Sequence, residues 1–194
     1  MTTRKHGFYS IFALISLLAL GITQSARANL ITNGGFETGD FTGWNVTGEA
    51  SVEGEVFGIP PHSGNFQAFV FTGALHQSVA TTPGASYTIS FLLAYSGVPL
   101  FTSFSVSWGG VTIYNLSNEP HFDYREITFN VTASDPSTEL LFQFRTNFPV
   151  GGWHLDDVRV NPGAGVGVPD GGSTVSLLGF ASLGLIALRR KLSR

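Results

Sequence analysis

Carboxylates are the side chains in this sequence best placed to do chemistry, and nearly all of them lie in its middle. Residues 29–162 contain twelve acids and only three basic residues, Arg125, Arg145 and Arg159, which gives this stretch a net charge of −9. Such a balance suits a bound divalent cation. It repels phosphate backbones, so we predict no nucleic-acid partner.

Two pairs of acids are close in sequence, but neither forms a catalytic pair by itself. Asp156 and Asp157 are adjacent, so on a regular strand their side chains point to opposite faces. Glu53 and Glu55 share a face, but beside Glu49 they are typical of the solvated edge of an exposed strand. Glycoside hydrolysis needs two carboxyl groups facing one cleft, roughly 5–9.5 Å apart.

Other catalytic and metal-binding motifs are missing from the sequence. It has no cysteine, which excludes a thiolate nucleophile or a thiolate metal site. Its five histidines show no metal-ligand spacing, and there is no Gly-x-Ser-x-Gly turn to present a nucleophilic serine. We nominate no catalytic residue and predict a protein that is not an enzyme.

Aromatic side chains are the remaining candidates for a binding site. Trp108 stands beside Gly109-Gly110 in what we predict to be a bent strand pair, with Tyr114 close by, and Trp153 follows another glycine pair. These three rings could stack on sugars, so we predict Trp108, Tyr114 and Trp153 as carbohydrate-binding residues, with a place in the core as the alternative for Trp153. Trp44 is predicted to lie in the core.

The elements that must position these residues read as short strands separated by turns. Val, Ile, Thr and aromatic residues gather over 66–72, 86–96, 102–117, 124–133, 138–148 and 153–161. Turn residues such as Pro and Gly stand between these segments, and none of them has a helical period. The pattern predicts an all-β domain over residues 29–162, an antiparallel jelly-roll β-sandwich.

Four short motifs in this stretch resemble a known family. They are NGGFE at 33–37 followed by Gly43-Trp44, HSGN at 62–65, PGASY at 83–87 and LDDV at 155–158. In that order they look like the galactose-binding-like β-sandwich of carbohydrate-binding modules in the family 4/9 group. The resemblance spans most of residues 30–160 and implies a carbohydrate-binding domain.

The resemblance also implies a cofactor. Modules of this family often hold a structural Ca²⁺ where the first and last strands meet, and the matching positions here are Glu37 and Asp156. Calcium takes six to eight oxygen ligands, so backbone carbonyls near Asn33 and residues 62–64 would complete the shell. The alternative is that both acids cap turns or accept hydrogen bonds from backbone amides.

The N-terminus has the three parts of a secretory signal. Arg4, Lys5 and His6 begin it, an apolar run over 11–22 follows, and Ala26 and Ala28 supply small residues at positions −3 and −1 of a cleavage site. We predict a signal peptide helix over residues 1–28 that signal peptidase removes. An uncleaved anchor helix is the alternative.

The C-terminus is also directed to a membrane. A Gly-rich linker and a Val-Pro-Asp motif occupy residues 163–170, and residues 171–194 contain eighteen uncharged residues followed by a basic tail. Such a segment is long enough for a transmembrane helix, with its basic end on the cytoplasmic side. An ordinary tail anchor is one interpretation.

The order of these C-terminal parts resembles a sorting signal. Its residues are Val168, Pro169, Asp170, Arg189, Arg190 and Lys191. It looks like the PEP-CTERM signal of Gram-negative bacteria, in a variant with Val-Pro-Asp in place of Pro-Glu-Pro. The resemblance implies processing by an exosortase-like transpeptidase of the membrane.

Taken together, these features predict an exported protein of the cell envelope or extracellular matrix. The precursor is expected to be anchored in the inner membrane of a Gram-negative-type bacterium through its C-terminal helix. We predict that its sandwich acts with exopolysaccharide or another glycan. The alternatives are a structural or adhesive surface protein without sugar binding and an extracellular polysaccharide hydrolase.

Overall fold

The computed structural model describes residues 28–146 and 151–163, and these form an all-β domain. Its strands are β1 (Asn45–Glu53), β2 (Gln67–Ala80), β3 (Ser86–Tyr95), β4 (Ser103–Trp108), β5 (Val111–Ser117), β6 (Phe122–Thr132), β7 (Ser137–Arg145) and β8 (Trp153–Pro162). Every pairing between them is antiparallel. The predicted all-β sandwich is confirmed.

The predicted membrane-directed segments lie almost wholly outside the residues that the structure describes. Residues 1–27 and 164–194, which carry the predicted signal peptide helix, the sorting motif and the transmembrane helix, lie outside the described residues. Within the described ranges, the structure has no helix long and apolar enough to cross a membrane.

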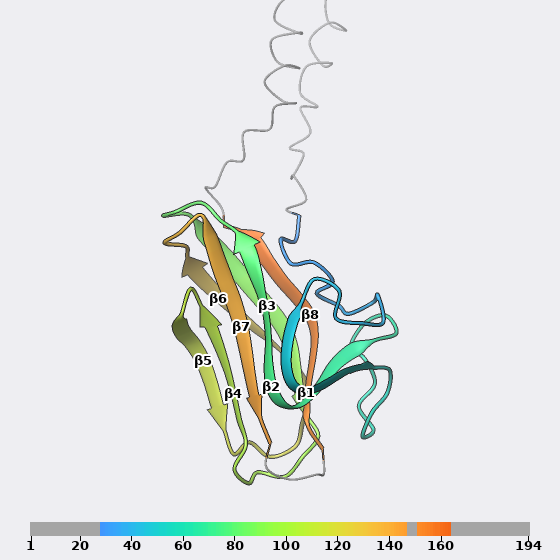
Figure 1. The fold of residues 1–194 in the computed structure, drawn as a ribbon. Helices are drawn as coiled ribbons and strands as arrows, with labels where there is room; N and C mark the ends of the chain where they lie inside the picture. Colours follow the sequence, from blue (N-terminus) through green and yellow to red (C-terminus); the bar gives the residue numbers. More distant parts are fainter. Residues whose placement is uncertain (1–27, 147–150, 164–194) are drawn as a thin grey trace, which may run out of the picture.

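Strand β2 joins the two layers of the sandwich. The strand order is β5-β4-β7-β2-β8-β3-β6, with β1 paired to β2. Residues 73–80 of β2 pair with β7, whereas residues 68–70 pair with β8. One layer therefore contains β5, β4, β7, β2 and β1, and the other contains β8, β3 and β6 (Figure 1).

The core between the layers is rich in phenylalanine. On β7 the residues at alternate positions, Leu140, Phe142 and Phe144, are buried, as the alternation of apolar and polar residues predicts. The rings of Phe91 and Phe104 pack on Phe142, with centroids 5.1 and 6.2 Å away. Each such ring stabilises the fold by about 1.5–3 kcal/mol through its burial. Trp44 is buried in the same core, which confirms its predicted place.

One predicted strand pair is confirmed, and one strand was not predicted. The segment 102–117 forms a hairpin of β4 and β5, as expected for the bent strand pair, because Gly109 and Gly110 turn the chain with φ angles of 56° and 79°. Strand β1 was not among the predicted segments, since glycine and exposed acids interrupt its apolar pattern. Glu49 and Glu53 are exposed on it, as predicted for an acidic edge.

The segment before β1 is hydrogen-bonded along β8. The amide of Leu30 donates to the carbonyl of Val160 at 2.9 Å, and the amide of Val158 donates to the carbonyl of Gly34 at 2.8 Å. A Cβ at position 34 would lie 2.0 Å from the carbonyl oxygen of Val158, so this approach requires glycine. These hydrogen bonds bring the opening motif, and with it Glu37, beside the closing motif on β8.

Candidate functional site

The structure brings the two predicted metal residues to opposite ends of one loop, residues 62–66. Asp156 is fully buried on β8, and its Oδ2 atom accepts hydrogen bonds from the amides of His62 at 2.9 Å and Ser63 at 3.1 Å. Its Oδ1 atom accepts the amide of Asp157 at 2.7 Å. One buried carboxylate therefore satisfies three backbone donors.

Glu37 holds the other end of the same loop. Its carboxylate oxygens both accept the amide of Asn65 at 3.0 Å, and Oε1 also accepts the amide of Phe66 at 3.0 Å. Between these contacts Gly64 has a φ of +62°, and a Cβ there would lie 2.3 Å from the carboxyl carbon of Glu37. Only glycine lets the loop pass so close to the carboxylate.

This arrangement is the alternative to calcium that the sequence left open. All four carboxylate oxygens of Glu37 and Asp156 face backbone N–H groups, whose positive ends point where a cation would sit. Over residues 28–146 and 151–163, no group of three or more His, Cys, Asp or Glu side chains is placed to hold a metal. The contacts in this structure are therefore those of the hydrogen-bonding alternative, and calcium binding stays a prediction.

Asp157 departs from the geometry expected for two adjacent acids on a strand. A bulge interrupts the pairing of β3 with β8, because Ser90 lies opposite Arg159 whereas Leu92 lies opposite Asp156. Asp157 adopts a left-handed φ of 51° at this bulge. Its carboxylate consequently turns to the Nδ1 atom of His62 at 3.0 Å, so Asp156 and Asp157 contact the same loop rather than opposite faces.

Burial makes Asp156 a weaker acid than usual. It raises the pKa of the Asp156 carboxyl to about 6, although hydrogen bonds from the amides of Ser63, Asp157 and His62 lower this pKa. Because the ionised form costs free energy inside the protein, three amide donors are needed to hold it there.

Two of the three predicted stacking rings are in the core instead of on the surface. Trp108 is 4% exposed and Trp153 is fully buried, and their indole N–H groups donate to the carbonyls of Thr132 and Arg145. Tyr114 is half-buried against Phe104 and Phe129. A sugar cannot reach the faces of the two buried tryptophans, so the structure corrects their predicted role. Their size made them good core residues, and burial cannot be read from residue type alone.

A buried polar network joins β2, β6 and β8 to Ser96, the residue that follows β3. Gln67 Oε1 accepts hydrogen bonds from Tyr124 at 2.5 Å and from His154 Nδ1 at 2.9 Å. Since an amide oxygen only accepts, Nδ1 of His154 carries the proton and Nε2 accepts from the Ser96 hydroxyl at 2.9 Å. Burial lowers the pKa of His154 to about 4, helped by the charge of His121.

This serine and histidine contact lacks the parts of a catalytic site. Gln67 stands where a carboxylate would orient a catalytic histidine and stabilise its protonated form. Ser96 Oγ also accepts the amide of Gly152 at 2.9 Å, which anchors it to the chain. The network is best interpreted as a fully bonded part of the core.

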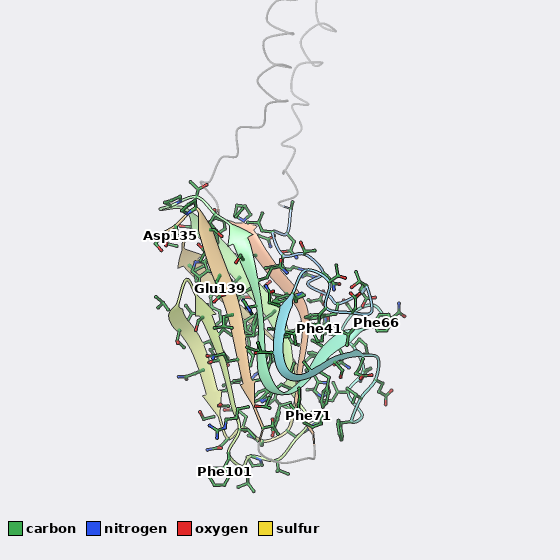
Figure 2. All side chains as sticks on the ribbon, viewed as in Figure 1. Phe41, Phe66, Phe71, Phe101, Asp135 and Glu139 are labelled. Atoms are coloured by element: carbon green, nitrogen blue, oxygen red, sulfur yellow. The ribbon has the colours of Figure 1, made fainter. Side chains whose placement is uncertain are left out.

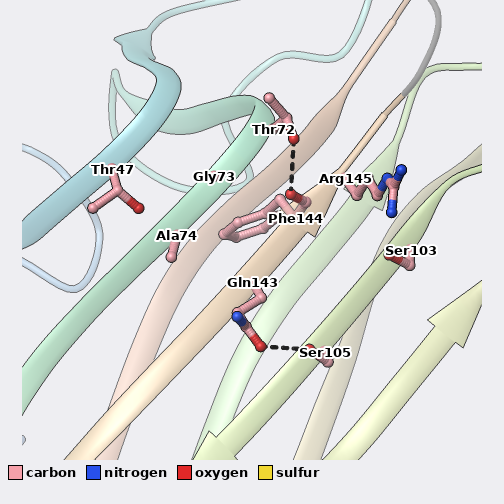
Figure 3. Close-up of a pocket in the computed structure, with 9 residues that line it drawn as sticks. All are labelled: Thr47, Thr72, Gly73, Ala74, Ser103, Ser105, Gln143, Phe144 and Arg145. Atoms are coloured by element: carbon pink, nitrogen blue, oxygen red, sulfur yellow. Dashed lines mark hydrogen bonds between the residues drawn. The ribbon is translucent and has the colours of Figure 1, made fainter.

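A polar groove of about 440 Å³ crosses the outer face of the layer that contains β1, β2, β7 and β4 (Figure 3). Its lining contains small hydroxyl side chains, one amide and one guanidinium. The lining residues are Thr47, Thr72, Gly73, Ala74, Ser103, Ser105, Gln143, Phe144 and Arg145.

The groove is formed by side chains that alternate between the two faces of each strand and by one pair of glycines. Ser103, Ser105, Gln143 and Arg145 point outward because they alternate with buried phenylalanines on β4 and β7. Gly73 pairs with Gly48 of β1, and a Cβ at position 73 would lie 1.9 Å from the carbonyl oxygen of Thr47. The missing side chain leaves the sheet surface hollow at that point.

None of the groove residues was a predicted site residue. A signal that could have found them is the alternation of polar and apolar residues along the strands. Ser103 and Ser105, like Gln143 and Arg145, stand at every second position, between buried apolar residues. The sequence alone does not place β1, β2, β7 and β4 side by side, however, so the four short polar sets could not be joined into one surface.

The C-terminus matches a family model, although only over a short stretch. Residues 167–192 match the VPDSG-CTERM motif. This match confirms the predicted PEP-CTERM-like sorting signal in its Val-Pro-Asp variant, and the predicted motif residues 168–170 and 189–191 lie within the matched stretch. No curated protein matches the sequence.

The sandwich is similar to solved carbohydrate-binding modules. A family 61 module solved in complex with β-1,4-galactotriose aligns with a TM-score of 0.56 and 18% identity, over 70% of this chain and 99% of the module. A family 16 module aligns with a TM-score of 0.52 and 17% identity, over 68% of this chain and 99% of its own.

A third similar structure is part of an enzyme. It contains the CBM22-1 and GH10 modules of a Clostridium thermocellum endo-1,4-β-D-xylanase complexed with xylohexaose, and it aligns with a TM-score of 0.52 and 15% identity. The alignment covers 71% of this chain and 29% of that one. The chain thus combines a VPDSG-CTERM motif with a β-sandwich that has the fold of carbohydrate-binding modules.

Proposed function

We propose that this chain is an exported, non-catalytic protein whose sandwich binds glycan in the groove across β1, β2, β7 and β4. The observation that carries this proposal is the lining of the groove, which presents hydroxyl, amide and guanidinium groups on a fold shared with carbohydrate-binding modules. Sugar hydroxyls form hydrogen bonds with side chains of this kind. Since the groove spans four strands, it suits a segment of polysaccharide rather than a single sugar.

The sorting motif supports an envelope or matrix location for this binding. We propose that signal peptidase cleaves after Ala28 and that the C-terminal helix holds the precursor in the inner membrane. An exosortase-like transpeptidase would then process the motif at 167–192. The protein would act with exopolysaccharide at the surface of a Gram-negative-type bacterium.

Polysaccharide pull-down of the full chain in a non-ionic detergent tests glycan binding. Gln143→Ala should weaken binding about tenfold, because it removes the one amide side chain among the described residues that line the groove. Asn130→Ala is the matched control, since Asn130 is an exposed amide on β6 of the other layer. Equal binding by both variants, or no binding to any glycan by the unaltered chain, would refute the proposal.

Calcium at Glu37 and Asp156 is tested separately. A melting temperature that rises with added Ca²⁺ and falls again with EDTA would support the predicted ion. An unchanged melting temperature in both solutions would refute it and leave the backbone amides as the partners of these carboxylates.

A second candidate function rests on an exposed apolar loop. Val98, Leu100 and Phe101 follow β3 and are 39%, 48% and 71% exposed, and Figure 2 shows Phe101 at the end of the sandwich opposite Asp135. Such a patch favours an adhesive surface protein that contacts a neighbour. Sedimentation of the chain at rising concentration tests this alternative, and Phe101→Ser should reduce the self-association that it predicts.

A further inference from the structure

We propose that the groove binds an acidic polysaccharide and that the guanidinium of Arg145 pairs with the carboxylate of a uronic-acid unit. This inference rests on the proposed function, because it names the class of glycan that the same groove takes. The planar guanidinium offers two parallel N–H donors, which match the two oxygens of a carboxylate.

Arg145 differs from the other arginines that the structure describes in having no carboxylate partner. Arg159 donates to Asp157 at 2.8 Å. Arg125 lies 3.8 Å from Glu119 and covers the ring of Phe122, with 3.9 Å from Cζ to the centroid. Within the described residues Arg145 makes no ion pair, and its side chain is exposed at the groove. Of the three arginines in residues 28–146 and 151–163, Arg145 is the one without a carboxylate partner there.

The surroundings of Arg145 in the groove add donors and no negative charge. No Asp or Glu is among the described residues that line the groove. Ser103 lies directly opposite Arg145, and Ser105 lies opposite Gln143, on the neighbouring strand β4. Hydroxyl and amide donors beside a guanidinium favour an anionic ligand that also carries hydroxyl groups.

The described residues of the groove offer no aromatic face for a neutral sugar. Among them only Phe144 is aromatic, and it is 3% exposed and packs into the core against Phe104 and Phe142. Neutral sugars are commonly held by stacking on exposed rings, and here that contribution is missing. Charge-assisted hydrogen bonds are the strongest contacts that this lining can make.

The net charge of −9 does not prevent this binding, because exposed charges are screened over about 8–10 Å at physiological salt. Glu139 stands on β7 with Arg145, but six residues of strand separate the two by roughly 20 Å. Figure 2 shows Glu139 toward the Asp135 end of the sheet, and its carboxylate is paired with His76 at 2.8 Å. Glu49 lies nearest in register, opposite Thr72, and is exposed to solvent.

Matched polymers separate charge from sugar shape. Affinity electrophoresis of the full chain in a non-ionic detergent would use polygalacturonate and alginate as acidic probes. Their methyl and propylene-glycol esters remove the charge but keep the backbone, and β-1,4-galactan serves as a neutral probe. We expect binding to at least one acid that falls about tenfold or more on esterification and in Arg145→Gln. A sulfated galactan distinguishes carboxylate recognition from attraction to any anion.

Two further variants distinguish carboxylate recognition by Arg145 from a general effect of positive charge. Arg145→Lys retains the charge but loses the two-pronged geometry, so it should bind the acid more weakly than the unaltered chain and more tightly than Arg145→Gln. Arg159→Gln removes an exposed arginine that lies outside the groove, and it should leave binding unchanged. Unaltered melting temperatures would show that all three variants fold.

The outcomes separate this inference from the proposed function. Binding to galactan or to the esters, with no preference for the acids, would overturn the inference and leave glycan binding standing. Acid binding that Arg145→Gln leaves intact would overturn it as well, and so would equal binding to the sulfated galactan and the uronates. If no polymer binds at all, both proposals fail.

Discussion

The corner around loop 62–66 and the groove around Arg145 use polar residues in opposite ways. In the corner, Asp156 and Glu37 direct their carboxylate oxygens at backbone amides, so these acids are occupied by the protein itself. In the groove, Arg145 has no carboxylate partner within the described residues, and Gln143 makes one long contact of 3.5 Å with Ser105. The first region stabilises the fold, and the second is available to a ligand.

This difference shows why conspicuous motifs are poor guides to a binding surface. The opening and closing motifs are recognisable because a tight corner restricts which residues fit it, as the glycine at position 64 illustrates. A binding surface on strands needs only outward polar side chains, and many residues satisfy that requirement. If the two regions have separate roles, substitutions in the corner should change stability, and substitutions in the groove should change glycan binding.

The largest expected effect is the loss of the buried acceptor in the corner. Asp156→Ala removes the partner of three amides, and each unsatisfied buried donor costs about 1–3 kcal/mol. We expect the free energy of unfolding to fall by about 3–5 kcal/mol, measured by urea denaturation. Asp123→Ala is the control, since that carboxylate is 94% exposed. A loss below about 1 kcal/mol would show that the amides find other partners.

A smaller loss of stability is expected from Gly64→Ala. The new Cβ would meet the Glu37 carboxylate and would add left-handed strain, for a total of about 2–3 kcal/mol. Gly84→Ala is a matched control, because Gly84 has a φ of +77° and no atom within 4 Å of the added Cβ. It should lose only about 1 kcal/mol, for the strain alone. Equal losses in the two variants would mean that the loop moves away from Glu37 without cost.

The pH dependence of stability tests the buried groups of β8. The pKa of His154 is lowered to about 4, so the unfolded chain binds more protons between pH 6.5 and 4 and stability falls with acidification. The pKa of Asp156 is raised to about 6, so between pH 6 and 3.8 the folded chain binds more protons and stability rises with acidification. The two effects oppose each other.

We therefore expect the unfolding free energy of the unaltered chain to change little between pH 6 and 4. In Asp156→Asn only the histidine effect remains, and stability should fall by about 3 kcal/mol from pH 6.5 to 4. Urea denaturation at a series of pH values, with EDTA present, measures both curves. A flat curve for Asp156→Asn would contradict the lowered pKa of His154.

The fold could be predicted well because its signal is local. Alternation on 138–148 correctly places Leu140, Phe142 and Phe144 inside, and glycine pairs mark the turns. The motifs likewise pointed to Glu37 and Asp156 as neighbours, and both now hold loop 62–66. What local signal could not give is the bulge at Asp157, which follows from how β3 and β8 pair over a distance in sequence.

The groove that we propose as the binding surface could not be predicted for the same reason. Thr47, Thr72, Ser105 and Gln143 come from four strands that meet only after the sheet is assembled. The tryptophans attracted attention because large aromatic rings serve both cores and sugar sites, and residue type does not distinguish the two. Trp153 is fully buried because Tyr95 packs on it at 4.4 Å, a contact between strands β8 and β3.

The smallest expected effect on stability comes from the groove itself. Ser105→Ala removes a half-buried hydroxyl from the outer face of β4, and the free energy of unfolding should change by no more than about 0.5 kcal/mol. Glycan binding should weaken about threefold to tenfold, because one hydrogen-bonding group is lost from the lining. Thermal melting and pull-down measured on the same preparation check both values, with Thr128→Ala as the control, because Thr128 is exposed on β6. A variant that lost stability in parallel with binding would show that the groove is part of the scaffold, and the separation between the two regions would then fail.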